Sequence, residues 1–119
     1  MTELVTLLST GKDTWTDVIK LMNAESWEKI VIITNQFGAD NIMKKENMEL
    51  IVIDSGKQSL FEIRDSLKKQ FDELLVGPEI ALNMLSGSGK EHMAVISSLL
   101  KSGFGIRQIA FFNNQVNEV

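Results

Sequence analysis

Short apolar runs alternate with helix-like segments along almost the whole chain, and this alternation constrains the fold more than any single motif. The runs cover residues 3–9, 29–34, 49–53 and 106–112, and we add residues 80–85 as a fifth. Apolar runs of this length, bounded by turn signals, are typical of buried strands. Strands that alternate with helices form parallel sheets with right-handed crossovers. We therefore expect an α/β fold, a Rossmann-like three-layer sandwich with a mainly parallel sheet of about five strands.

Apolar residues recur at steps of three and four in three segments between these runs. The segments cover residues 15–22, 60–74 and 93–100. This spacing predicts amphipathic helices, with Ser59 as the N-terminal cap of the second and Gly103 as the end of the third. We expect a short helix or an irregular crossover over residues 38–47. The break at Gly77-Pro78 leaves too few residues before the next turn for a helix, which is why residues 80–85 are predicted as a strand.

Composition narrows the class of protein. The chain has 119 residues, of which 44% are hydrophobic and 24% charged, so we expect one globular domain over residues 1–119. We expect a cytoplasmic protein, because no apolar run approaches a membrane span and no signal peptide is recognisable. With no cysteine and a single histidine, His92, thiolate and multi-histidine metal sites are excluded, so a metal site would have to rest on carboxylates. We expect no metal and no cofactor. The net charge of −4 argues against a surface for duplex DNA.

Two polar, glycine-containing loops follow the first and fourth predicted strands. In open parallel sheets ligands bind at the carboxyl edge, in the crevice where the strand order reverses. If the order is 3-2-1-4-5, that crevice lies between these two strands. Small residues let a ligand approach the backbone, a helix N-terminus favours an anion and a lysine adds a mobile positive charge. The predicted phosphate-binding residues are Ser9, Thr10, Gly11, Lys12, Ser86, Gly87, Ser88, Gly89 and Lys90.

Other residues at the same edge are weaker candidates. Thr34, Asn35 and Gln36 close the second strand and are candidate contacts for a base or ribose, although a plain polar loop explains them equally well. Asp54 could bind a ribose hydroxyl, but Asp-Ser-Gly is a common turn, and we favour the turn. We expect His92 to be a solvated first-turn residue rather than a general acid or base. Trp15 and the six methionines are interpreted as structural, largely core, residues.

The second loop lacks the known phosphate fingerprints. Lys90 is followed by Glu91 where a P-loop has a serine or threonine, and the third glycine of GxGxxG is missing. We therefore exclude a Walker A nucleotide hydrolase. Taken alone, Gly87, Ser88 and Gly89 fit a tight turn with a serine cap as well as they fit a binding loop.

Residues 81–103, ALNMLSGSGKEHMAVISSLLKSG, resemble the strand, loop and helix of CARF domains, the CRISPR-associated Rossmann-fold sensors of cyclic oligoadenylates. The matching positions are Asn83, Ser86, Gly87, Ser88, Lys90 and Met93. The resemblance implies antiviral defence, a homodimer, and a nucleotide ligand held across the dimer by this loop and by the loop after the first strand. Serines replace both threonines of the family pattern, and Gly-Ser replaces its central Gly-Gly.

The resemblance also bears on output and turnover. CARF proteins usually carry a C-terminal effector, whereas only NNQVNEV follows Phe112, so we expect an effector partner whose identity the sequence leaves unknown, or output through the domain itself. Slow cleavage of the cyclic ligand stays open, because in-line geometry and charge stabilisation can suffice. No catalytic acid–base pair is identifiable, so we assign no catalytic residue and expect binding with weak or absent turnover.

Two alternatives belong to different classes of protein. LLSTGKDTW is similar to the Ser-Gly-Gly-x-Asp-Ser loop of PP-loop ATP pyrophosphatases, with Ser9, Gly11, Asp13 and Thr14 at matching positions. We rank this ATP-binding alternative second, because the chain ends after about one minimal five-stranded unit. The third alternative is a dimerisation or protein-docking domain without a small ligand, since small Rossmann-like domains host many functions.

Overall fold

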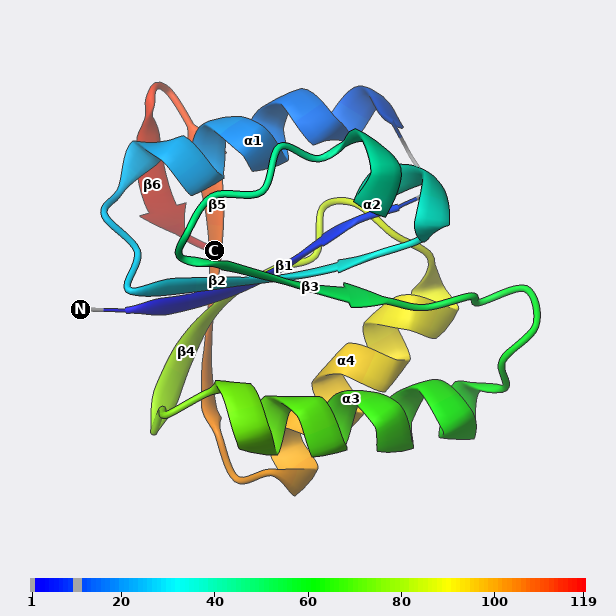
Figure 1. Ribbon diagram of the computed structural model, residues 1–119. Coiled ribbons are helices and arrows are strands. Elements are labelled where there is room, and N and C mark those ends of the chain that lie inside the picture. Colours follow the sequence, from blue (N-terminus) through cyan, green and yellow to red (C-terminus); the bar gives the residue numbers. More distant parts are fainter. Residues whose placement is uncertain (1, 10–11) are drawn as a thin grey trace.

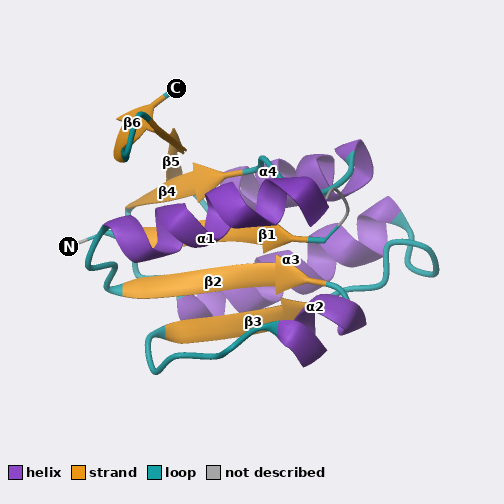
Figure 2. Cartoon of the chain, turned by 90° about the horizontal axis from the view of Figure 1, so that it is seen from above, coloured by secondary structure: helices purple, strands orange, loops and turns teal. Residues whose placement is uncertain are grey.

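The computed structural model describes residues 2–9 and 12–119, with Lys12 described by its backbone alone. Its centre is a six-stranded sheet in the order β3-β2-β1-β4-β5-β6 (Figures 1 and 2). The strands are β1 (Glu3–Leu8), β2 (Lys29–Thr34), β3 (Met48–Val52), β4 (Glu79–Asn83), β5 (Gly105–Phe112) and β6 (Gln115–Glu118). The pairs among β1 to β5 are parallel, which confirms the expected α/β fold with a mainly parallel sheet.

The sheet contains one more strand than we expected, and that strand makes it mixed. β6 pairs antiparallel with β5, and Phe112 faces Gln115 across a two-residue turn. The turn residues Asn113 and Asn114 have φ angles of 53° and 59°, the left-handed geometry that twisted hairpins favour and that asparagine tolerates. Because Gln115–Glu118 has a single apolar residue, Val116, apolar patterning could not mark it as a strand.

β4 ends two residues earlier than the predicted range of 80–85. Its backbone pairs with β5 only as far as Leu82 and Gln108, after which β5 turns toward β6. At this divergence the side-chain amide of Asn83 donates to the carbonyl oxygen of Ile109 at 2.8 Å, replacing a backbone bond of the ladder. Its side-chain oxygen accepts from the amide of Leu85 at 3.2 Å and so begins the loop that follows. Asn83 therefore terminates the strand.

Helices cover both faces of the sheet. A short 3₁₀ segment (Lys12–Thr14) leads into α1 (Trp15–Ala24), and the other helices are α2 (Gln36–Asn41), α3 (Leu60–Leu74) and α4 (Gly89–Lys101). Figures 1 and 2 show α1 and α2 on one face and α3 and α4 on the other. Ser59 caps α3 as predicted, and residues 42–47 form the irregular crossover that follows the short α2. Within the described part of the chain, no helix is both long enough and apolar enough to cross a membrane.

Two apolar clusters form the core, one on each side of the sheet. On β1, Val5 and Leu7 point toward the cluster that includes α3 and α4, whereas Leu4 and Leu8 point toward the cluster that includes α1. All six residues of β1 are buried, as expected for a central parallel strand with helices on both faces. Because both faces of β1 are buried, its sequence is a nearly continuous apolar run.

Candidate functional site

The strand order places the predicted crevice between β1 and β4. From β1 the sheet continues through β2 and β3 on one side and through β4 and β5 on the other, so the strand order reverses here. The two loops at this point meet: the amide of Ser9 donates to the hydroxyl of Ser86 at 3.0 Å, across 77 positions of sequence. Of the predicted first loop, Thr10 and Gly11 lie outside the described residues, as does the side chain of Lys12.

A buried carboxylate, Glu91, organises the crevice. It is 2% exposed and accepts hydrogen bonds from the hydroxyls of Ser9 at 2.7 Å and Ser55 at 3.0 Å. It also accepts from the amide of Ser88 at 2.9 Å, closing a capping box at the start of α4. Our sequence reasoning missed this role, although the Ser-x-x-Glu spacing of a capping box was present. Glu91 thus joins the ends of β1 and β3 to the first turn of α4.

Several of the predicted site residues have structural roles here. Ser9, Thr34 and Ser86 are buried. The hydroxyl of Thr34 donates to the carbonyl oxygen of Leu8 at 2.6 Å, which ties the end of β2 to the end of β1. Asn35 caps α2 by accepting a hydrogen bond from the amide of Gly38 at 2.8 Å. The three buried residues shape the carboxyl edge of the sheet without forming its exposed surface, whereas Asn35 is partly exposed.

The residues from Gly87 to Lys90 form the accessible part of the predicted second loop. Gly87 has a φ of 108°, a conformation that favours glycine, and Gly89 is exposed. The capping box satisfies the amides of Ser88 and Glu91, but the amides of Gly89 and Lys90 have no acceptor among the described residues. Unpaired amides at the start of a 13-residue helix carry partial positive charge. This turn can therefore accept an anion.

The ammonium group of Lys90 is bound within the protein, and this differs from the mobile charge that we expected. Its Nζ donates to the carbonyl oxygens of Ser55 at 2.7 Å and Gln58 at 2.6 Å, so it ties the β3–α3 loop to α4. His92 is also partly buried rather than simply solvated, and its Nε2 lies 2.9 Å from the carbonyl oxygen of Ser86. Because a carbonyl oxygen only accepts, this contact requires that Nε2 carry a hydrogen.

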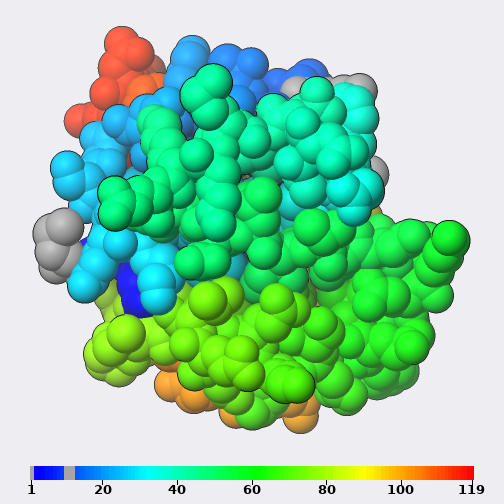
Figure 3. Space-filling model, viewed as in Figure 1, coloured from blue at the N-terminus to red at the C-terminus, as the bar shows by residue number. Residues whose placement is uncertain are grey.

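A polar hollow of about 530 Å³ lies at the carboxyl ends of β2 and β3. It is lined by Asn35, Gln36, Phe37, Val52, Ile53, Asp54, Ser55 and Gln58. In Figure 3 α2, in turquoise, and the green loop after β3 border an indentation at the right of the view. Asp54 forms the turn that we favoured, since its Oδ1 accepts from the amides of Gly56 at 3.1 Å and Lys57 at 3.2 Å.

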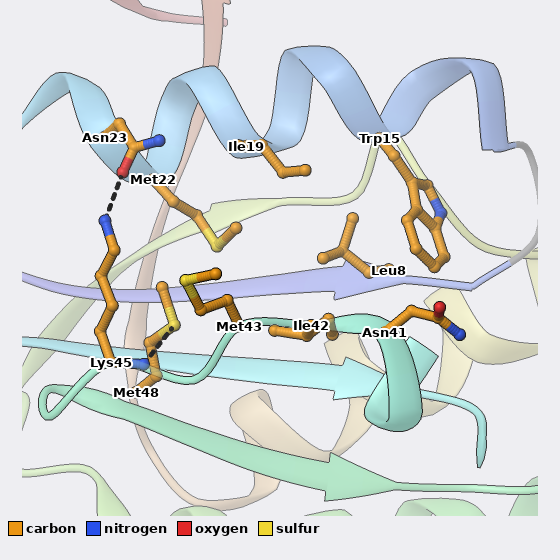
Figure 4. Close-up of a pocket in the computed structure, with 10 residues that line it drawn as sticks. All are labelled: Leu8, Trp15, Ile19, Met22, Asn23, Asn41, Ile42, Met43, Lys45 and Met48. Atoms are coloured by element: carbon orange, nitrogen blue, oxygen red, sulfur yellow. Dashed lines mark hydrogen bonds between the residues drawn. The ribbon is translucent and has the colours of Figure 1, made fainter. Parts of the chain in front are cut away.

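A second hollow, of about 260 Å³, lies between α1 and the segment that follows α2 (Figure 4). It is lined by Leu8, Trp15, Ile19, Met22, Asn23, Asn41, Ile42, Met43, Lys45 and Met48. Trp15 is only partly buried and its indole nitrogen donates to the carbonyl oxygen of Ser9 at 3.1 Å. Met43 is 85% exposed, so not all methionines are core residues as we expected. The largely apolar lining suits an apolar group rather than a phosphate.

Within the described residues no group of three or more histidine, aspartate and glutamate side chains could share a metal ion. Comparisons of the chain with protein-family models, with curated proteins and with solved structures found no match.

Proposed function

We propose that this chain is a ligand-sensing domain of the CARF type, a Rossmann-like three-layer sandwich that binds a cyclic oligoadenylate or a related nucleotide. The observation that carries the proposal is the meeting of the β1 and β4 loops at the reversal of strand order, through the 3.0 Å bond from Ser9 to Ser86. At this position an exposed helix N-terminus begins at Gly89. A phosphate bound there would accept from the amides of Gly89 and Lys90 and benefit from the dipole of α4.

Lys90 has a second role in this proposal. Its ammonium group lies against the carbonyl oxygens of Ser55 and Gln58, and the first turn of α4 carries its backbone. A phosphate at Gly89 would therefore lie near a fixed positive charge. Fixing the charge before the ligand binds reduces the entropy lost on binding. Because Lys90 also binds the loop of residues 54–58, a ligand that shifts Lys90 would shift this loop as well.

The exposed face of α4 supports the homodimer that a CARF-type sensor requires. Met93 and Leu100 are each 62% exposed, and with Ile96 they line a shallow surface hollow. Exposed apolar patches mark interaction surfaces. A second copy packed on this stripe would bring two Gly87–Lys90 turns together around a two-fold axis, so that a cyclic ligand could contact one turn from each subunit. The effector that reads this state remains unassigned, and we place the sensor in the cytoplasm.

We propose binding with weak or absent turnover. A general base must reach the proton it removes, but the Nε2 of His92 is held by the carbonyl oxygen of Ser86. The buried Glu91 is surrounded by the hydroxyl and amide donors of Ser9, Ser55 and Ser88. Neither residue is placed for proton transfer to a ligand at Gly89. Rapid, metal-independent ring opening by the purified protein would contradict this part of the proposal.

Calorimetric titration with cyclic tetra-adenylate, cyclic hexa-adenylate and ATP tests the proposal. The wild type is compared with Gly89→Asp and with the control variant Gly89→Asn, whose side chain has the same shape but no charge. A side chain at Gly89 meets no atom within 4 Å of its Cβ, so both variants fit the fold. An acidic residue at a helix N-terminus also favours the helix. We expect the wild type and Gly89→Asn to bind one ring per dimer, and Gly89→Asp to bind at least about tenfold more weakly, because its charge repels the phosphate.

The other outcomes overturn the proposal in favour of a named alternative. Binding of ATP alone would favour the PP-loop-like ATP-binding domain. If none of the three ligands binds, the result would favour a dimerisation or protein-docking domain in which the glycine loops are only turns. Circular dichroism of each variant checks that a loss of binding is not a loss of folding.

A further inference from the structure

The polar hollow at the ends of β2 and β3 lies on the same edge of the sheet as the crevice. Neighbouring strands are about 4.8 Å apart, so a point between β2 and β3 is roughly 10 Å from a point between β1 and β4. The sugar and base of a nucleotide extend over a similar distance from its phosphate. A ligand with its phosphate at Gly89 could therefore reach this hollow.

The hollow and the first turn of α4 are physically connected. Lys90 donates to the carbonyl oxygens of Ser55 and Gln58, both of which line the hollow. Glu91 accepts from the hydroxyl of Ser55 at 3.0 Å. The same two residues of α4 therefore fix one wall of the hollow relative to the crevice.

Three side chains that line the hollow each have one polar atom in a hydrogen bond within the protein and a second polar atom that is not. The Oδ1 of Asn35 accepts from Gly38, and the Oδ1 of Asp54 accepts from Gly56 and Lys57. The Oε1 of Gln58 accepts from the amide of Asp54 at 2.8 Å. Among the described residues, the Nδ2 of Asn35, the Oδ2 of Asp54 and the Nε2 of Gln58 have no hydrogen-bond partner. The hollow thus presents two donors and one acceptor, which suit the edge of a base and the hydroxyls of a ribose.

The remaining lining favours an uncharged, partly aromatic group over a phosphate. Phe37 is 49% exposed, and its ring centroid lies 6.0 Å from that of Trp15, the first residue of α1. The exposed part of an aromatic ring is a surface that a base can contact. Asp54 is the one charged residue in the lining, and its carboxylate repels anions. The start of α4 therefore suits the phosphate of a nucleotide, and the hollow suits its base and ribose.

We infer that this hollow is a nucleoside subsite, which takes the base and ribose of a nucleotide whose phosphate lies at the start of α4. Phe37 stacks on the base, and Asp54 accepts a hydrogen bond from a ribose hydroxyl. The inference rests on the proposed function for the phosphate end of the ligand. On this inference, the β2–α2 and β3–α3 connections bind the base and ribose, which the crevice alone does not hold.

Backbone amide shifts in NMR spectra of the ¹⁵N-labelled full chain test the inference, with adenosine, inorganic pyrophosphate and ATP as separate probes. We expect adenosine to shift the amides of residues 35–37 and 54–58, pyrophosphate to shift those of residues 87–90, and ATP to shift both groups. Phe37→Leu removes the aromatic face and keeps an apolar side chain. Asp54→Asn keeps the Oδ1 that accepts from Gly56 and Lys57. Each variant should weaken adenosine binding at least fivefold and leave pyrophosphate binding unchanged.

The inference and the proposed function fail in different ways. If pyrophosphate shifts residues 87–90 but neither adenosine nor ATP shifts residues 35–37 and 54–58, the nucleoside subsite is wrong and the phosphate site stands. If both variants bind adenosine as the wild type does, the subsite is equally wrong. If adenosine shifts the hollow but no anion shifts residues 87–90, the proposed function is wrong and the hollow is a nucleoside site by itself. No shift with any probe overturns both.

Discussion

The carboxylate of Glu91 accepts a hydrogen bond of 2.7 Å from the hydroxyl of Ser9, which lies 82 positions earlier in the chain. The same carboxylate holds the hydroxyl of Ser55 and the amide of Ser88. One buried charge therefore fixes the ends of two strands to the first turn of α4. A buried carboxylate is tolerated only when donors surround it, and here three donors do so.

Replacing Glu91 with glutamine should lower the free energy of unfolding by about 1–3 kcal/mol, because charge-assisted bonds are lost and an amide group faces buried donors. Urea denaturation measures this loss. The matched control is Glu62→Gln in the capping box of α3, where the exposed Glu62 accepts from the amide of Ser59 at 2.8 Å. We expect a loss below about 1 kcal/mol there. Equal losses would show that the contacts of Glu91 to Ser9 and Ser55 contribute nothing.

Two glycines of the same turn should respond oppositely to alanine. At Gly87, with a φ of 108°, a Cβ would lie 3.0 Å from Leu7 and 3.1 Å from both Glu91 and His92. Gly87→Ala should therefore destabilise the protein by about 1–3 kcal/mol. At Gly89 a Cβ meets nothing within 4 Å, so Gly89→Ala should be neutral or stabilise by up to about 1 kcal/mol. Chemical denaturation of both variants checks the contrast, and a tolerated Gly87→Ala would contradict it.

The strands that could be predicted are those whose burial leaves a pattern in the sequence. β1 and β2 are covered on both faces, and their apolar runs gave their positions to within one residue. β6 could not be found, because a hairpin edge needs only the turn at Asn113 and Asn114 and one apolar residue. The end of β4 depends on where β5 diverges, a tertiary event that the local sequence of Asn83 does not encode.

The candidate site shows the same division. The sequence was enough to predict that the loops containing Ser9 and Ser86 lie at one crevice if the strand order is 3-2-1-4-5, because topology alone brings those strand ends together. The hydrogen bond between the two residues is a finding of the structure. The partners of Lys90 were not predictable, since they are backbone carbonyls of a distant loop, and any residue type supplies a carbonyl. Glu91 was visible as a capping residue, but its contact with Ser55 required the third strand to be placed.

Gly38 and Thr34 should be energetically coupled. A Cβ at Gly38 would overlap the hydroxyl oxygen of Thr34, the group that donates to the carbonyl oxygen of Leu8 at 2.6 Å. We expect Gly38→Ala to cost about 1–3 kcal/mol by overpacking. Adding Thr34→Ala removes the overlapping atom, so the double variant should be less destabilised than the sum of the single variants by at least about 0.5 kcal/mol. A urea-denaturation cycle of the four proteins measures the coupling, and strict additivity would contradict the contact.

Lys90 should control the order of the β3–α3 loop in the absence of any ligand. Lys90→Met keeps the aliphatic stem and removes both bonds to the carbonyl oxygens of Ser55 and Gln58, each worth about 0.5–1.5 kcal/mol. The amide hydrogens of residues 54–58 should then exchange with solvent at least about fivefold faster, because the free energy of local opening is lower. Hydrogen exchange followed by NMR gives the rates residue by residue. Lys57→Met in the same loop is the control, since the side chain of Lys57 is exposed and the turn is held by the backbone amide of Lys57. If both variants exchange alike, Lys90 does not hold the loop, and any loss of ligand binding in a Lys90 variant would then reflect its charge alone.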